Sequence, residues 1–90
     1  AVYRTAMIIT YKPEEVAQQI FTALERGVTM LHGMGGYTHE ERTILYSVIT
    51  QSEIPQLKEI VKEVDPRAFM VIGQAHEALG EGFRPLMETK

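Results

Sequence analysis

The succession of strand-like and helix-like segments leaves this chain few possible folds. Residues 3–10, which read YRTAMIIT, are rich in β-branched and apolar side chains and predict a strand. Further strands are predicted at residues 28–32, 42–50 and 68–72, with one helical pattern after the first strand and another after the third. The order β-α-β-β-α-β is that of the split βαβ, or ferredoxin-like, motif. We therefore predict an α+β fold, a four-stranded antiparallel sheet with two helices on one face, in which strands 3–10 and 42–50 lie side by side in the middle.

The first helix has signals at both of its ends. Pro13 suits a first helical turn, where its missing N–H is not needed, and Glu14 and Glu15 suit the positive end of the helix dipole. Gly27 predicts the C-cap, because glycine adopts the left-handed conformation at little cost. Between these ends runs an apolar stripe of helical period, formed by Val16, Ile20 and Leu24 with Ala17 and Ala23 beside them.

The second helix is bounded as clearly. Thr50 and Glu53 have the spacing of a capping box, and Pro55 falls within the first turn. Asp65 precedes Pro66 and ends the helix, because the residue before a proline is driven out of the helical region. The apolar positions recur at helical spacing: Ile54, Leu57, Ile60 or Val61, and Val64.

The size and charge of the chain exclude several classes of protein. Ninety residues form one domain, and a formal net charge of −3 argues against nonspecific nucleic-acid binding, which needs a basic surface. The absence of cysteine rules out disulfides, thiolate metal sites and a cysteine nucleophile. No run approaches the roughly 20 apolar residues that cross a bilayer, and no signal peptide is visible. Because Ala1 comes first and a strand follows directly, we expect residues 1–90 to be a single domain cut from a longer protein.

Both faces of the predicted sheet are apolar. A sheet with helices on one face should alternate apolar and polar residues. In three strands both sets are apolar instead: Ile44, Tyr46 and Val48 against Leu45 and Ile49; Met7 and Ile9 against Ala6 and Ile8; Phe69 and Val71 against Met70 and Ile72. We expect copies of the same chain, in a dimer or trimer, to cover the helix-free face. The alternative is that the C-terminal tail folds back over it through Leu79, Phe83, Leu86 and Met87.

The connection between the second and third strands is rich in glycine and is the first candidate site. Backbone N–H groups of Gly33, Gly35 and Gly36 could converge on an anion. The residues that follow could add side-chain donors and a stacking ring: Tyr37, Thr38, His39 and Arg42. The spacing fits neither a Walker A loop nor a dinucleotide-binding loop. The alternative is a hairpin tip that needs glycine only for its backbone geometry.

The second candidate is the tail from His76 to Phe83, where a short extra element is expected at residues 76–79. His76, Glu77 and Glu81 could bind a metal or another chain, but their spacing matches no standard ligand set, and we expect no metal. The three histidines, His32, His39 and His76, are far apart in sequence. No nucleophile or paired-carboxylate motif is present, so we expect a non-enzymatic domain without a cofactor.

Three runs of the sequence together resemble a known family. They are RGVT followed by the G-x-G-x-Y-T loop; E-x-x-x-L-K-x-x-V-x-x-x-D-P-x-A-F from Glu53 to Phe69; and HEALGEGF from His76 to Phe83. The pattern is similar to that of the C-terminal domain of YitT-type bacterial membrane proteins, the domain of unknown function 2179 family. The matched positions are Gly33, Gly35, Tyr37 and Thr38 in the loop, and His76, Glu77, Gly80, Gly82 and Phe83 in the tail.

The resemblance implies a ferredoxin-like fold with a layout similar to that of the PII proteins, which bind nucleotides or small anions at subunit clefts. It also implies a parent protein with transmembrane helices before this domain, and a place for the domain on the cytoplasmic face of the bacterial cell membrane. Our leading hypothesis is a regulatory, ligand-sensing domain in which the glycine loop binds a nucleotide or small anion between subunits. The alternative is a purely structural oligomerisation domain without a ligand.

Overall fold

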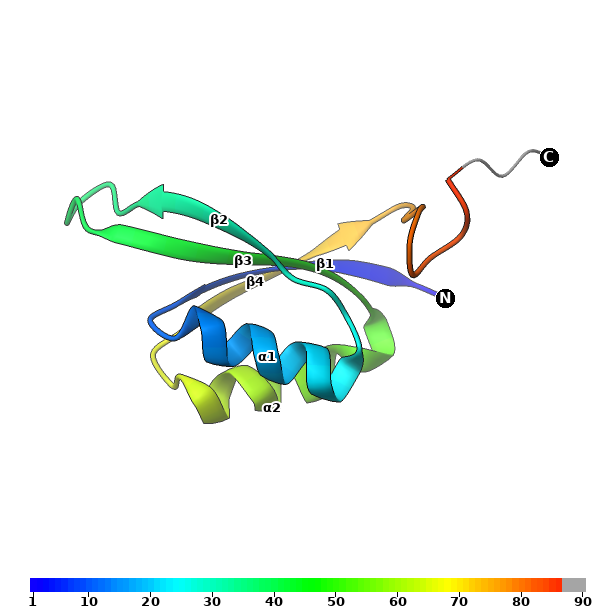
Figure 1. Cartoon of the computed structure of the whole chain (residues 1–90), viewed down its shortest axis with the longest axis horizontal. Helices are drawn as coiled ribbons and strands as arrows, with labels where there is room; N and C mark the ends of the chain where they lie inside the picture. The colour runs from blue at the N-terminus through cyan, green and yellow to red at the C-terminus, as the bar shows by residue number, and fades with distance from the viewer. Residues whose placement is uncertain (87–90) are drawn as a thin grey trace.

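Two helices lie on one side of a four-stranded antiparallel sheet in the computed structural model, which describes residues 1–86 (Figure 1). The strands are β1 (Tyr3–Thr10), β2 (Thr29–Met34), β3 (Glu41–Thr50) and β4 (Phe69–Ala75), and the helices are α1 (Pro13–Leu24) and α2 (Ile54–Val64). The order across the sheet is β2-β3-β1-β4. The predicted α+β, ferredoxin-like order β-α-β-β-α-β is confirmed, with β1 and β3 as central strands.

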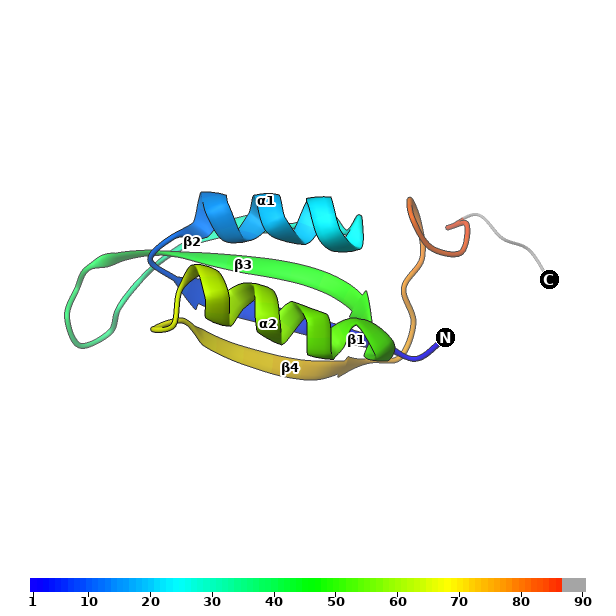
Figure 2. The ribbon, with the colours of Figure 1, turned by 90° about the horizontal axis from the view of Figure 1, so that it is seen from below.

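The core fills the space between the sheet and the helices, which Figure 2 shows side by side over one face. The central strands supply side chains with no exposed surface, Ala6 and Ile8 from β1 and Leu45 and Ile49 from β3. The predicted apolar stripes of the helices pack in the same core: Val16 and Ile20 from α1, and Leu57, Ile60 and Val61 from α2. Burial of each large aliphatic side chain stabilises the fold by about 1.5–3 kcal/mol relative to exposure. The amphipathic pattern therefore accounts for one face of the sheet.

The ends of the helices follow the sequence signals with one exception. Thr50 and Glu53 form the predicted capping box, here on a short 3-10 turn (Gln51–Glu53) that leads into α2. Gly27 is not the C-cap of α1, and that prediction is wrong. Glu25 adopts the left-handed conformation instead, with φ of 56°, and its N–H bonds to the Phe21 carbonyl at 2.9 Å. The helix has to stop two residues earlier than the glycine, because the chain turns there towards β2.

Two strands are longer than their composition predicts. β2 continues past His32 to Met34, and β4 continues past Ile72 to Ala75. Each extension contains a glycine, Gly33 or Gly73, and glycine is depleted in strands, so local composition predicts an earlier end. Pairing with a neighbouring strand overrides that preference. The β2–β3 hairpin consequently projects beyond the helices at one end of the molecule (Figure 1).

A buried carboxylate joins the two turns beneath this end of the sheet. Asp65, which ends α2 and is only 4% exposed, accepts hydrogen bonds from the Thr10 hydroxyl at 2.6 Å, the Tyr11 N–H at 2.9 Å and the Arg67 N–H at 3.0 Å. These hydrogen bonds, the Thr10 hydroxyl first, hold the pKa of Asp65 below its ordinary value of 3.8. The β1–α1 turn and the α2–β4 turn are thereby fixed to each other.

Candidate functional site

The face of the sheet that the helices do not cover, here called the open face, carries side chains in rows across the strands. The register places Ile9 between Ile44 of β3 and Phe69 of β4, and Leu31 of β2 beside Ile44. The next row along the strands contains Thr29, Tyr46, Met7 and Val71. These two rows form the centre of the open face and contain no charged side chain.

Six large side chains in these rows are exposed. Phe69 is 61% exposed and Val71 is 50% exposed, and the others are between 37% and 42% exposed: Ile9, Leu31, Met7 and Tyr46. Together they leave about 500 Å² of side-chain surface uncovered, taking roughly 190 Å² for a free side chain of this size. The largest apolar patch of an ordinary monomer spans roughly 300–600 Å² and often has a function. The prediction that both faces of the sheet are apolar is confirmed.

A basic row bounds the open face at the hairpin end. Tyr11 follows β1 directly, and extension of the printed pairings sets it between Arg42 on one side and Arg67 on the other. Both guanidinium carbons lie 4.6 Å from the centroid of the Tyr11 ring. Arg42 also forms an ion pair at 3.3 Å with the exposed Glu40. No sequence motif marks Tyr11 or Arg67, because only the register of three strands brings them beside Arg42.

The tail bounds the open face at the opposite end. Gly80 and Gly82 have φ angles of 111° and 86°, which L side chains rarely adopt, so both glycines are needed for the turn. The turn brings the Phe83 ring edge-on to Tyr3, with 5.3 Å between centroids, and under the Arg26 guanidinium, 5.1 Å from the centroid. Two segments singled out by the family resemblance thus meet through Arg26 and Phe83.

The tail covers only this end of the open face. Leu79 is 40% exposed and Leu86 is 68% exposed, and Met87 lies outside the described residues. The element expected at residues 76–79 is also absent from the structure, and that prediction is wrong. His76 and Glu77 are exposed in irregular chain, and Leu79 makes only an isolated bridge to Arg84. The glycines that follow favour a turn over a regular element.

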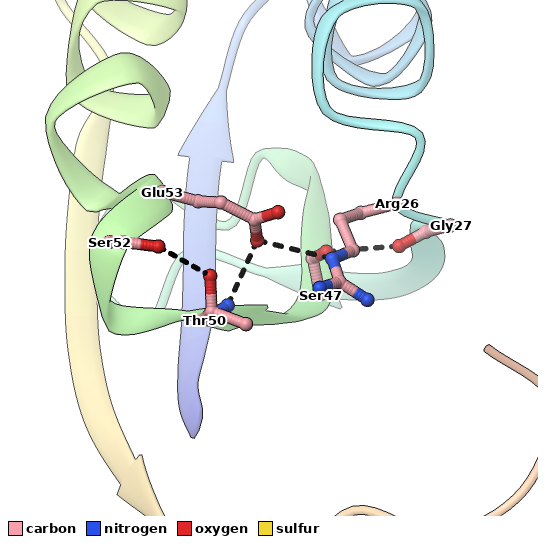
Figure 3. A network of polar contacts seen from close by, with 6 residues as sticks. All are labelled: Arg26, Gly27, Ser47, Thr50, Ser52 and Glu53. Atoms are coloured by element: carbon pink, nitrogen blue, oxygen red, sulfur yellow. Dashed lines mark hydrogen bonds and ion pairs between the residues drawn. The ribbon is translucent and has the colours of Figure 1, made fainter. Parts of the chain in front are cut away.

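A network of polar contacts holds the segment before β2 against the start of α2 (Figure 3). The Glu53 carboxylate accepts the Thr50 N–H at 2.9 Å and the Arg26 Nε–H at 3.1 Å. Burial by itself would raise the pKa of Glu53, but these hydrogen bonds and the Arg26 charge outweigh it, and the pKa lies below its ordinary value of 4.5. The buried Ser47 hydroxyl donates to the Gly27 carbonyl at 2.9 Å. The network places Arg26 where Phe83 can pack on it.

A cavity of about 290 Å³ lies beside this contact. Its walls come from the α1–β2 connection, from β3 and from the tail: Glu25, Arg26, Gly27, Thr29, Tyr46, Ser47, Val48, Glu81, Gly82 and Phe83. The tail motif therefore contributes to a hollow at the edge of the open face, and does not gather the histidines.

The glycine loop at the tip of the hairpin closes on its own backbone. The Gly35 N–H donates to the Glu40 carbonyl at 2.8 Å, and the His39 N–H donates to the Gly35 carbonyl at 2.9 Å. A Cβ at Gly35 would meet the Thr38 hydroxyl at 2.6 Å, so a side chain there would force the Thr38 side chain to shift. His39 adopts the left-handed conformation, with φ of 61°. The Gly35 donor expected to hold an anion is thus used inside the hairpin.

The other residues of the predicted loop site are exposed at the tip or belong to the β2–β3 ladder. Tyr37 is 96% exposed, Gly36 is exposed, and Gly33 pairs with Arg42 within the β2–β3 ladder. A cavity of about 640 Å³ runs along the base of the hairpin and is lined by His32, Gly33, Met34, Glu41, Arg42 and Thr43. Ligand binding at this loop stays a prediction.

Residues 1–86 contain no metal-binding cluster, because no three of their histidine, aspartate and glutamate residues gather as a metal site would require. Neither helix described there has the length and apolar character of a membrane span.

The fold and site define an α+β domain of ferredoxin-like topology with an uncovered apolar face between a basic row and a folded tail. A family model described as "Uncharacterized protein conserved in bacteria (DUF2179)" matches residues 26–80, and the chain belongs to this family. The crystal structure of a DUF2179 protein from Eubacterium ventriosum is similar, with a TM-score of 0.69 at 30% identity over 79% of this chain and 97% of that one.

Relatives with longer sequences carry the same domain. An uncharacterized protein from the cccA 5′ region of Bacillus sp. strain PS3 is 46% identical over 81 residues, which are 90% of this chain and 54% of that protein. The UPF0750 membrane proteins YvjA and YitT of Bacillus subtilis strain 168 are 42% and 41% identical, over 90% and 84% of this chain. The chain spans only 29% and 27% of their lengths. The resemblance to YitT-type proteins is confirmed.

Proposed function

We propose that this chain is a non-enzymatic domain of a membrane protein, on its cytoplasmic face, and that it holds subunits together through the open face of its sheet. The membrane proteins YvjA and YitT among its relatives support the attachment to a membrane protein. The observation that carries the proposal is the pair of uncharged rows at the centre of the open face, with six large exposed side chains. Water contact with so much apolar surface is unfavourable, and association removes it.

The area suits a small interface. A standard protein interface buries roughly 800 Å² on each partner, and a homodimer interface is about 65% apolar. The exposed side chains of the two central rows supply about 500 Å² of such a surface. This is close to the apolar area that each partner contributes to a homodimer interface of standard size. Phe69 and Val71, at the β4 side, are the most exposed members of the rows and would lie within the contact.

The occupant that fits best is a second copy of the chain. In a two-fold dimer the same patch is used twice and must complement itself. Two uncharged, apolar rows satisfy that condition without placing like charges together, whereas the basic row lies at one end. The tail reaches only the opposite end and leaves Phe69 exposed, so it does not replace a partner.

Sedimentation velocity over a range of concentrations tests the proposal. The wild-type chain is expected to associate, and Val71→Glu is expected to be monomeric at the same concentrations, because a carboxylate cannot be buried in the apolar contact. Gln19→Glu, which adds the same charge on the exposed side of α1, is the matched control and should associate like the wild type. Circular dichroism checks that both variants fold. A wild-type chain that stays monomeric, or a Val71→Glu variant that associates normally, would contradict the proposal.

Ligand sensing is the second candidate function, favoured by the cavity of about 640 Å³ along the hairpin base and by the exposed Tyr37 at its tip. In this role a nucleotide or small anion binds between subunits, orders the loop and shifts the attached membrane part between two states. A thermal-shift titration with nucleotides tests it, because a ligand that binds only the folded state raises Tm. If no nucleotide shifts Tm and Arg42→Ala leaves assembly unchanged, the ligand-sensing role is excluded and the structural role is favoured.

A further inference from the structure

Two arginine side chains converge on one tyrosine ring at the end of the open face. Arg42 comes from β3, and Arg67 comes from the turn before β4. Since each guanidinium carbon is 4.6 Å from the Tyr11 centroid, the two carbons are at most twice that distance, 9.2 Å, apart. Stacking on an aromatic ring is favourable for a guanidinium and restricts its side-chain conformations. Tyr11 therefore holds two like charges within 9.2 Å of each other.

The carboxylates near this row do not neutralise it fully. Glu40 pairs with Arg42 at 3.3 Å, but its side chain is 64% exposed, and such exposed pairs are weak. The Asp65 carboxylate accepts two backbone N–H groups and the Thr10 hydroxyl. No carboxylate in residues 1–86 lies within ion-pair distance of Arg67. Lys12, exposed and next along the chain from Tyr11, acts with its positive charge on Asp65.

We propose that Arg42 and Arg67, arranged by Tyr11, bind a phosphate-bearing polyanion. Each guanidinium presents five N–H donors in a planar fork that matches phosphate oxygens. Two forks no more than 9.2 Å apart can share linked phosphates, which carry several charges over a short span. The neighbouring apolar row, from Leu31 to Phe69, limits water on one side and strengthens these charge-assisted bonds.

This site shares Arg42 with the predicted glycine-loop site but adds Tyr11 and Arg67. It depends on the pairing of β1 with β3 and β4, whereas the loop site depends on the tip of the hairpin. The inference rests on the ligand-sensing role and deepens it by assigning the bound phosphates to Arg42 and Arg67. Both arginines and Tyr11 belong to one chain. Sedimentation therefore tests self-association separately, and the two proposals can fail independently.

Isothermal titration calorimetry with inorganic triphosphate at low salt tests the site on the whole chain. We expect saturable binding to the wild type and a loss of roughly tenfold in affinity for Arg67→Gln, since a charge-assisted hydrogen bond contributes at least the equivalent of a factor of ten. Lys62→Gln, which removes one positive charge from the exposed side of α2, is the matched control and should bind like the wild type. Tyr11→Ala should weaken binding while Tyr11→Phe retains it, because the ring arranges the arginines.

A second arm distinguishes a free phosphate compound from a lipid headgroup. Phosphatidylcholine vesicles with and without phosphatidic acid are sedimented with the wild type and with Arg67→Gln. Binding of triphosphate without binding to the acidic vesicles identifies a soluble ligand, and the reverse identifies a membrane surface; both support the site if Arg67→Gln reduces them. Absence of binding in both arms would overturn the proposal, as would equal losses for Arg67→Gln and Lys62→Gln, which indicate net charge alone.

Discussion

The carboxylate of Asp65 gives the most direct test of how this fold is held together. Its three hydrogen-bond donors come from Thr10, Tyr11 and Arg67, so its removal should loosen both turns at the hairpin end at once. Asp65→Ala leaves the Thr10 side chain, only 4% exposed, without its carboxylate partner. The other two donors are the backbone N–H groups of the exposed residues Tyr11 and Arg67, where water can take the place of the carboxylate.

The expected loss follows from that difference. A hydrogen bond to a charged group contributes about 1.5–3 kcal/mol to stability. A donor that binds water in place of the carboxylate recovers most of this free energy. We therefore expect Asp65→Ala to lower the free energy of unfolding by about 3 kcal/mol and Tm by roughly 15 °C for a domain of this size. Asp65→Asn, which keeps one carbonyl acceptor, should lose less. Glu63→Ala, on the exposed side of α2, is the control and should change stability by less than about 0.5 kcal/mol.

Urea denaturation at several pH values provides the assay. Because the pKa of Asp65 is lower in the folded chain than its ordinary value of 3.8, the carboxylate stabilises the fold above that pH. The contribution is lost as the pH falls through the pKa of Asp65 in the folded chain. The difference in the free energy of unfolding between the wild type and Asp65→Asn should therefore narrow below pH 3.8. A gap that is constant with pH, or an Asp65→Ala variant as stable as the control, would refute the reasoning.

Two further substitutions probe the network and the sheet. Glu53→Gln should lower the free energy of unfolding at pH 7 by about 1 kcal/mol, because the Thr50 N–H and Arg26 lose a charged acceptor. Urea titration should show this loss shrinking below pH 4.5, since the pKa of Glu53 is lowered in the folded chain. Gly73→Ala should destabilise by about 1–2 kcal/mol, because the added Cβ would lie 2.8 Å from the Thr5 hydroxyl oxygen. Adding Thr5→Ala to Gly73→Ala should restore most of the lost stability, as measured by thermal unfolding. If the losses of the two single variants simply add in the double variant, the clash is excluded.

Local signals in the sequence were sufficient for most of the architecture. Hydrophobic period separates strands from helices because it reports which side chains share a face, and it needs no knowledge of neighbours. The capping box of Thr50 and Glu53 is equally local, since both partners lie within one turn. The apolar character of both sheet faces was visible for the same reason. The left-handed residue Glu25 was missed because a glycine two places on offered the cheaper cap.

The candidate site was visible only in part. Arg42 could be singled out from its place after the glycine loop, but nothing in the sequence sets it beside Tyr11 and Arg67. The contact of Phe83 with Arg26 likewise cannot be predicted from the sequence, although both residues belong to the motifs shared with the family. Such neighbours depend on strand register, and one place of slip would move each side chain to the opposite face.

The order of the elements, the faces they bury and the apolar character of the open face follow from the sequence, because each depends on residues a few places apart. The projection of the hairpin, the end of the open face that the tail covers and the charges that meet around Tyr11 follow only from the folded arrangement. These features join residues that are distant in sequence, and their positions are set by the pairing of all four strands together.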